Sequence, residues 1–106
     1  MRVPSLFAIA ILLLAMPLTG AETIHVNNLT GNDRATGRTA EPQGDNGPVQ
    51  TLAAGAALAG WGDRLVIANT GVPYREILCL AGPFHGGSER QPFVVEGNGA
   101  VLDGTV

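Results

Sequence analysis

The clearest candidates for chemistry are three acidic residues in a long polar loop, residues 27–47. Asp33, Glu41 and Asp45 stand there among asparagines and glycines, and carboxylate and amide oxygens are the hard ligands that Ca²⁺ prefers. Their spacing does not follow the Asp-x-Asp-x-Asp-Gly pattern of a Ca²⁺ loop. Isolated acids in Gly- and Asn-rich sequence are mostly turn formers. We therefore favour solvated turn residues, and metal binding by this loop is the alternative.

The other polar residues suited to catalysis do not form a recognisable set. Arg75 and Glu76 are adjacent next to a turn, but neighbours on a strand point to opposite faces and are poorly placed to act together. His85 lies in a flexible Gly- and Pro-containing loop, where we expect it to be solvated, and no Asp or Ser is spaced to complete a triad with it. His25 is predicted to face outward from a strand. The sequence therefore identifies no catalytic and no cofactor-binding residue.

Trp61 and Cys79 are each the only residue of their type in the chain. Trp61 stands between two glycines after a helical run, where an indole either stacks on a sugar ring or packs over the helix end as an apolar plug. We favour the plug, because large aromatic side chains are usually well buried. Cys79 has no partner for an internal disulfide. Within an apolar strand we expect a buried, inert thiol, and an intermolecular bond is the alternative.

The first 21 residues have the layout of a secretory signal peptide. Arg2 supplies the positive start, an apolar run extends from Leu6 to Met16, and small residues follow up to Ala21, after which we predict cleavage. A membrane anchor is the competing interpretation, but this run is well short of the about 20 residues that span a bilayer. We therefore expect a secreted or periplasmic product, residues 22–106, with no membrane attachment after cleavage.

The charge of the chain argues against nucleic acid as a partner. The six basic residues are all arginines scattered along the sequence, and the net charge is −3. Nucleic-acid binding relies on clustered Lys and Arg that neutralise phosphates. The predicted mature segment has about 85 residues, a size at which a lone core is marginal, and the sequence leaves its oligomeric state open.

Hydrophobic periodicity predicts one short helix and several short strands. The helix covers Thr51 to Ala59, a run of alanine and leucine interrupted by Gly55. Glycine costs about 1 kcal/mol relative to alanine inside a helix, which predicts a short or frayed helix. The predicted strands are residues 23–26, 65–68, 77–80, 92–96 and 100–102.

The order of these pieces resembles the N-terminal region of secreted right-handed parallel β-helix proteins of the pectate-lyase-like superfamily. The resemblance covers nearly all of the mature chain. It rests on a leading strand, a Gly-Asn-Asp loop, a capping helix, Gly-Asp, an apolar strand, a Tyr-Arg-Glu turn and a Leu-Asp-Gly end: Ile24–Val26, Gly31–Asp33, Thr51–Ala59, Gly62–Asp63, Leu65–Ile67, Tyr74–Glu76 and Ala100–Gly104. The chain departs from the family pattern at Gly71–Tyr74, where an extra residue widens the turn.

The resemblance implies a mainly β fold, with an N-terminal capping helix and the first two or three coils of an incomplete right-handed parallel β-helix, or solenoid. The helix then covers the open apolar end of the first coil. In a solenoid the inward side chains of successive coils stack into ladders. These are expected to be Leu65, Ile67, Leu78, Leu80, Phe93 and Val95. Because solenoids need about three or more repeats, we expect the front of a longer protein or a fragment.

The same resemblance implies a polysaccharide partner. Enzymes of this superfamily include polysaccharide lyases and glycoside hydrolases, several of which act on uronic-acid polymers, and their catalytic groups lie on coils beyond the region matched. Lyase chemistry needs Ca²⁺ or cationic groups to neutralise the substrate carboxylate, so the resemblance identifies no cofactor here and leaves Ca²⁺ open for a longer protein. The predicted function is the N-terminal segment of an exported protein that binds or processes polysaccharide. The alternative is a non-catalytic β-solenoid for surface attachment or scaffolding.

Overall fold

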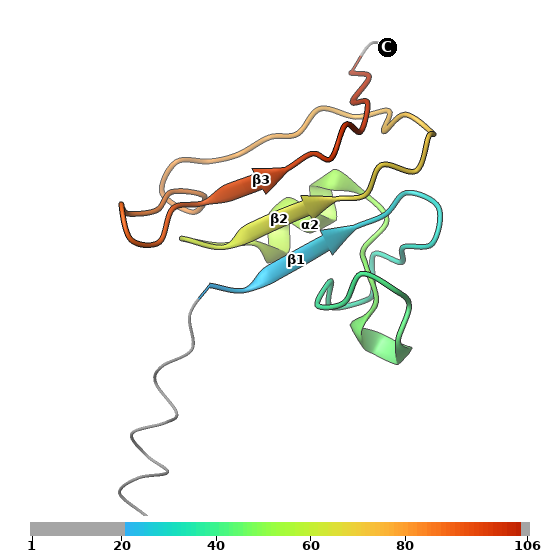
Figure 1. Cartoon of the computed structure of the whole chain (residues 1–106), viewed down its shortest axis with the longest axis horizontal. Helices are drawn as coiled ribbons and strands as arrows, with labels where there is room; N and C mark the ends of the chain where they lie inside the picture. The colour runs from blue at the N-terminus through green and yellow to red at the C-terminus, as the bar shows by residue number, and fades with distance from the viewer. Residues whose placement is uncertain (1–20, 105–106) are drawn as a thin grey trace, which may run out of the picture.

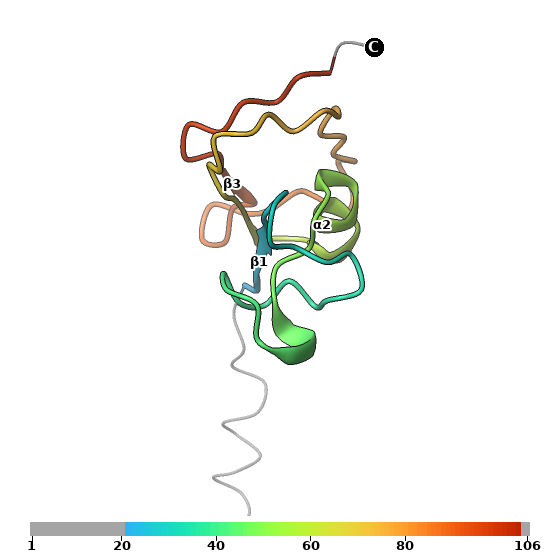
Figure 2. The ribbon, with the colours of Figure 1, turned by 90° about the vertical axis from the view of Figure 1, so that its right-hand side faces the viewer.

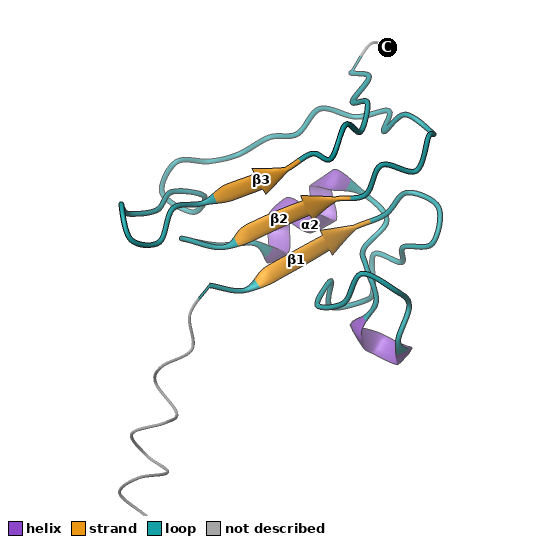
Figure 3. Ribbon diagram, in the orientation of Figure 1, coloured by secondary structure: helices purple, strands orange, loops and turns teal. Residues whose placement is uncertain are grey.

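Three short parallel strands form one sheet in the order β1-β2-β3. The structure, a computed structural model, describes residues 21–104, so residues 1–20 of the predicted signal peptide lie outside the described residues. Strand β1 spans Thr23–Val26, β2 spans Arg64–Ile67 and β3 spans Val94–Glu96 (Figures 1 and 3). In register, Ile24 pairs with Leu65 and Leu65 with Val95.

Helix α2, Leu52–Leu58, packs on β1 and β2 and not on β3, and Figure 2 shows it beside one face of the sheet. Thr51 caps the helix by accepting a hydrogen bond from the Ala54 N–H. Gly55 faces the sheet so closely that a Cβ there would lie 2.6 Å from Val26 Cγ2. The glycine that weakens the helix is therefore the residue that lets it approach the sheet.

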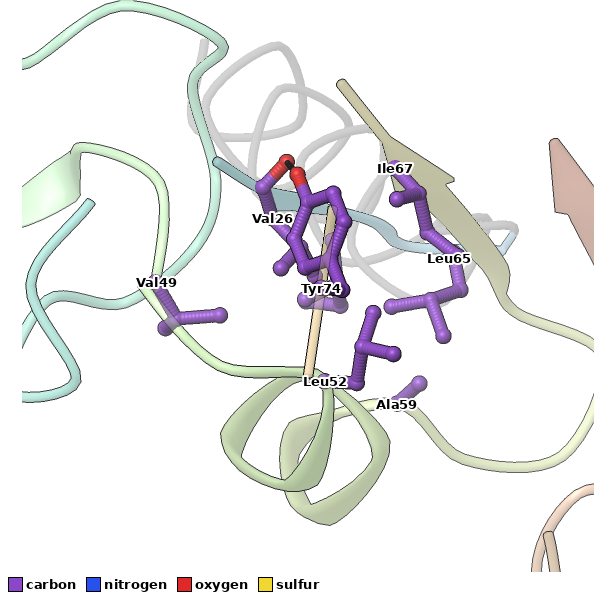
Figure 4. Packing of buried hydrophobic residues seen from close by; sticks show 8 residues of the cluster. Val26, Val49, Leu52, Ala59, Leu65, Ile67 and Tyr74 are labelled. Atoms are coloured by element: carbon purple, nitrogen blue, oxygen red, sulfur yellow. Dashed lines mark hydrogen bonds between the residues drawn. The ribbon is translucent and has the colours of Figure 1, made fainter. Parts of the chain in front are cut away.

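The core lies between α2 and the inward faces of β1 and β2 (Figure 4). Its buried apolar side chains are Ile24, Val26, Val49, Leu52, Ala56, Ala59, Leu65, Ile67 and Tyr74. Tyr74 is the largest of them, and its hydroxyl donates to the Ala68 carbonyl at 2.8 Å. A buried phenol needs such a partner, so Tyr74 links the core to the end of β2.

The two outer edges of the sheet differ in whether other backbone segments cover them. On the β1 side, the His25 N–H donates to Gly37 O at 2.7 Å, and the Val49 N–H donates to His25 O at 3.0 Å. Residues 27–47, which include a 3-10 turn at Gly44–Asn46, thus wrap the β1 edge with hydrogen-bonded backbone. The outer edge of β3 has no such cover among residues 21–104.

The expected fold of a capping helix with two or three solenoid coils is wrong for residues 21–104. The parallel strand direction agrees with it, but the structure is a small three-stranded parallel sheet with one helix and no evident coils. Two predicted strands are missing. Residues 77–80 form no strand, and residues 100–102 make one bridge, from Leu102 to Tyr74. With no neighbouring strand to pair along their length, these apolar segments remain irregular.

Candidate functional site

A cleft of about 490 Å³ lies between the C-terminal half of α2 and the loop that contains residues 83–85. Its lining runs from Ala56 to Trp61 on one side and from Pro83 to His85 on the other. The lining contains no Asp, Glu, Lys or Arg. Trp61 and Phe84 are 56% and 68% exposed, although both are large aromatic residues. The cleft is therefore a shallow apolar surface flanked by two uncovered rings.

Hydrogen bonds hold the turn that carries Trp61. The Asp63 carboxylate accepts hydrogen bonds from the Gly60 N–H at 2.7 Å and from the Glu22 N–H at 2.9 Å. Gly62 has φ +72°, a left-handed conformation that favours glycine, and its N–H donates to Gly86 O at 2.7 Å. Trp61 is thus held on a rigid turn with its ring exposed. The expected plug over the helix end does not form.

Gly86 shapes the position of the indole. A Cβ at Gly86 would lie 2.6 Å from Cζ3 of Trp61, so one part of the ring rests directly on the backbone of the opposite loop. Glycine is required here by this close approach. The cleft therefore joins two segments that are more than twenty residues apart in sequence.

His85 ties the second wall of the cleft to the first. Its Nδ1 accepts a hydrogen bond from the Ala81 N–H at 2.8 Å, and its Nε2 lies 2.7 Å from the Ala56 carbonyl of α2. This pair of partners requires a neutral ring with the proton on Nε2. The ring also meets Phe93 edge to face at 5.3 Å. His85 is thus a half-buried structural anchor, in contrast to the solvated residue that we expected.

A second, smaller hollow of about 190 Å³ lies on the other side of the Trp61 turn. Gly60 and Trp61 line the first cleft, whereas Gly62 and Arg64 line this hollow together with Arg90. Arg64 pairs with Glu96. No ion pair of Arg90 occurs among residues 21–104. An aromatic surface and a guanidinium group therefore flank the same turn.

The three acidic residues of the 27–47 loop do not come together. Within residues 21–104, no group of three or more His, Cys, Asp and Glu side chains is arranged to hold a metal ion. Asp33 instead accepts hydrogen bonds from the Gln50 and Thr51 N–H groups at 2.8 and 2.9 Å, and from the Thr51 hydroxyl. Burial acts to raise the pKa of the Asp33 carboxyl, but these hydrogen bonds lower it more, so its pKa is below the usual value.

Glu76 and Arg75 have separate structural partners. The Glu76 carboxylate accepts hydrogen bonds from the Leu52 N–H at 2.7 Å and the Ala53 N–H at 3.1 Å, at the start of α2. Those N–H groups have no partner inside the helix, and a carboxylate there is also favoured by the helix dipole. Arg75 lies 3.8 Å from Asp103. The pair thus does not form a catalytic unit.

The remaining candidates also lie apart from the cleft. His25 was predicted to face outward, and it lies on the sheet face opposite Ile24. Partial burial lowers the pKa of its imidazole. Cys79 is exposed, so the predicted burial of its thiol is wrong. Its segment forms no strand, and Leu78, not Cys79, is the residue that packs against the core.

No family model matches the chain, and no curated protein or solved structure was found to match it. The resemblance to β-helix proteins therefore stays a prediction from the sequence. Among residues 21–104, the helices are too short to cross a membrane.

Proposed function

We propose that this chain binds polysaccharide through the cleft between Trp61 and Phe84. The observation that carries the proposal is that both aromatic rings border one cleft and are more than half exposed. Exposing a large aromatic surface to water is unfavourable, and exposed apolar surface bordering a cleft marks a binding site. A sugar ring presents a flat face of C–H groups that can cover an aromatic ring.

Preorganisation supports the same proposal. Trp61 is fixed by the Gly60–Asp63 turn, and the Phe84 wall is fixed by the two hydrogen bonds of His85. A surface that is already ordered loses little conformational entropy on binding. Because both ring nitrogens of His85 are engaged and no other titratable side chain lines the cleft, we propose that this site binds and does not itself catalyse.

The arginine hollow supports an acidic polysaccharide, such as a uronic-acid polymer, as the ligand. Arg90 and Arg64 lie beyond the turn that carries Trp61, so a chain stacked on the indole would bring its next residues toward them. Guanidinium groups bind carboxylates through paired hydrogen bonds. The proposed export through the 1–21 signal peptide would bring the cleft to extracellular polysaccharide.

Titration with oligogalacturonates and with neutral cello-oligosaccharides tests the proposal. Trp61 is the only tryptophan in the chain, so its fluorescence reports directly on the cleft. We expect Trp61→Ala, followed by calorimetry, to weaken binding about fivefold or more, because losing a stacked aromatic contact costs about 1–3 kcal/mol. The matched control is Leu29→Ala, which removes an exposed apolar side chain outside the cleft.

Different variants test the acidic ligand and the cleft itself. Arg90→Gln should weaken binding of the acidic oligomer and leave that of the neutral oligomer unchanged. Equal loss for both oligomers, or no loss for either, would reject the acidic ligand. Absence of binding by the unaltered protein to every oligomer, or full affinity in Trp61→Ala, would reject the cleft as a saccharide site.

A further inference from the structure

His85 is the one titratable side chain in the lining of the cleft between α2 and residues 83–85. Its two ring nitrogens bond to different segments. Nδ1 accepts from the Ala81 N–H at 2.8 Å, and Nε2 donates to the Ala56 carbonyl at 2.7 Å. Only the neutral imidazole has one acceptor and one donor nitrogen. The two contacts therefore exist together in one protonation state of the ring and not in the other.

The Ala56 contact fastens the loop to the end of α2. In a continuing helix the Ala56 carbonyl would accept from the Gly60 N–H, but that N–H donates to the Asp63 carboxylate at 2.7 Å instead. The Ala56 carbonyl is thus one of the groups that a helix leaves unsatisfied at its end, and the Nε2–H of His85 satisfies it. A positive charge on the ring strengthens such a bond, so protonation keeps this contact.

The Ala81 contact closes the turn that carries Phe84. The Phe84 and His85 N–H groups both donate to the Ala81 carbonyl, at 2.9 and 2.8 Å, and the Ala81 N–H donates to Nδ1 of His85. A proton taken up from solvent at Nδ1 turns this acceptor into a second donor. Two N–H groups then face each other and the bond is lost. Because Phe84 lies between the two residues, their separation displaces the Phe84 wall of the cleft.

We propose that protonation of His85 loosens residues 81–86, so that the cleft is closed at neutral pH and opens in weakly acidic solution. Imidazole is the side chain that ordinarily changes charge between about pH 5 and pH 8. The loosening is a property of the fold alone. Its consequence, weaker saccharide binding in acid, rests in addition on the proposed function.

The elements that carry and receive the ring bring no opposing charge. Helix α2 consists of alanine, leucine and glycine, and residues 81–88 contain no titratable side chain besides His85. Glu89 and Arg90 come next in the chain, both at exposed positions. The charge that protonation adds is therefore the first one on this part of the cleft.

The carboxylates on the remaining neighbouring elements have other partners. Phe93 meets the His85 ring edge to face at 5.3 Å and leads into β3, where Glu96 pairs with an arginine. Asp63, on the turn before β2, accepts hydrogen bonds from two backbone N–H groups. Within residues 21–104, no ion pair involves His85. No such pair therefore holds the charged ring in the closed position.

Acrylamide quenching of Trp61 fluorescence tests the loosening without any saccharide. Part of the indole rests on Gly86, the neighbour of His85, so movement of this loop exposes the ring further. Trp61 is the only tryptophan in the chain. In the protein recovered after expression of the full chain, we expect the quenching constant to rise between about pH 7.5 and about pH 5, while the far-ultraviolet circular dichroism stays unchanged.

Three variants assign this rise to His85. His85→Asn keeps an acceptor oxygen near the position of Nδ1 but does not titrate, so its quenching should stay low at both pH values. His85→Gln keeps a donor near the position of Nε2 and lacks the Nδ1 acceptor, so its quenching should be high at both. His25→Gln removes the other histidine of the chain, which lies outside the cleft, and should keep the pH dependence. Circular dichroism checks that each variant is folded, and either His85 variant suffices for the comparison.

Quenching of the unaltered protein that does not change with pH would overturn the inference. A pH dependence that persists in the His85 variants, or that is lost in His25→Gln, would also overturn it.

Calorimetry at the same two pH values tests the consequence for binding. A neutral cello-oligosaccharide has no titratable group, and its affinity should weaken about twofold or more in acid, the size expected for the net loss of one hydrogen bond. Unchanged affinity despite increased quenching would show that the loosening does not regulate the site. Increased quenching in a protein that binds no oligomer would reject the saccharide site and leave the pH-dependent loosening standing.

Discussion

Residues 21–76 and residues 77–104 differ in how they are stabilised. Among residues 21–104, every buried side chain of the apolar core lies between Ile24 and Tyr74. The later segment adds only partly buried residues against that core, among them Leu78 and Phe93. Both segments are rich in apolar residues, so hydrophobicity alone does not determine which of them forms the core. Contact with α2 and pairing along the sheet determine which segment forms the core.

The first segment also satisfies its own backbone with carboxylates. Asp33 accepts from the residues before α2, Glu76 accepts from the first turn of α2, and Asp63 accepts from Glu22 and Gly60. The second segment supplies the Phe84 wall of the cleft and the open edge of β3 instead. The buried core and these carboxylate contacts thus lie in the first segment, and the second segment is packed less tightly.

The largest expected difference in the free energy of unfolding between the two segments comes from a pair of leucine truncations. Leu65→Ala removes a completely buried side chain of β2 and should lower the free energy of unfolding by about 2–5 kcal/mol. Leu80→Ala removes a side chain that is 44% exposed and should change it by less than about 0.5 kcal/mol. Urea unfolding followed by circular dichroism measures both. Equal losses would show that residues 77–104 share the core.

An intermediate effect is expected at the contact between helix and sheet. Gly55→Ala improves helix propensity by about 1 kcal/mol, but its Cβ would lie 2.6 Å from Val26 Cγ2 and 3.1 Å from Leu65 Cδ1. Overpacking of a core costs about 1–3 kcal/mol, so we expect net destabilisation in thermal unfolding. Ala57→Gly, at an exposed helix position, is the control and should cost about 1 kcal/mol from propensity alone. A more stable Gly55→Ala protein would show that α2 can move away from the sheet.

The smallest effect concerns the link between the 27–47 loop and α2. Because the pKa of Asp33 is lowered in the folded protein, its contribution to stability is complete above the unfolded pKa of about 3.9 and is lost as the pH falls through the folded value. Asp33→Asn, which keeps one acceptor oxygen, should cost about 1 kcal/mol at neutral pH. The free energy of unfolding of Asp33→Asn should therefore fall less than that of the unaltered protein as the pH is lowered.

Unfolding curves from neutral pH to about pH 3 compare these two proteins. Asp45→Asn is the matched control, since it alters another exposed acid of the same loop. Parallel pH profiles for the unaltered protein and Asp33→Asn would indicate that the Asp33 contacts do not stabilise the fold.

Parts of this fold follow from local sequence. Alternation of apolar residues predicted the strands at 23–26 and 65–68 within one residue of their observed bounds, and the Ala/Leu run predicted α2. Leu65 and Ile67 are buried as their periodicity required. The prediction failed at residues 77–80, where an equally apolar run has no partner strand. Periodicity describes which side chains could share a face, but it does not supply the neighbour that makes a strand.

The candidate site was predicted less well than the helix and the first two strands. Trp61 was recognised as a residue that could stack on a sugar, but its partner Phe84 was not, and the anchoring role of His85 was missed. The glycines at 62 and 86 were the available signal, because close backbone approach requires them.

By itself, the sequence determined the local elements of this protein: the apolar faces of β1, β2 and α2, the turns at glycine, and the absence of a cationic cluster. Tertiary structure alone decided that Asp33 and Glu76 bond to the start of α2, that Trp61 stays exposed beside Phe84, and that Val95 lies uncovered on a core-facing row. The physical reason is that each of these outcomes depends on contacts between residues far apart in the chain. Local propensity and periodicity carry no information about which distant segment arrives to make such a contact.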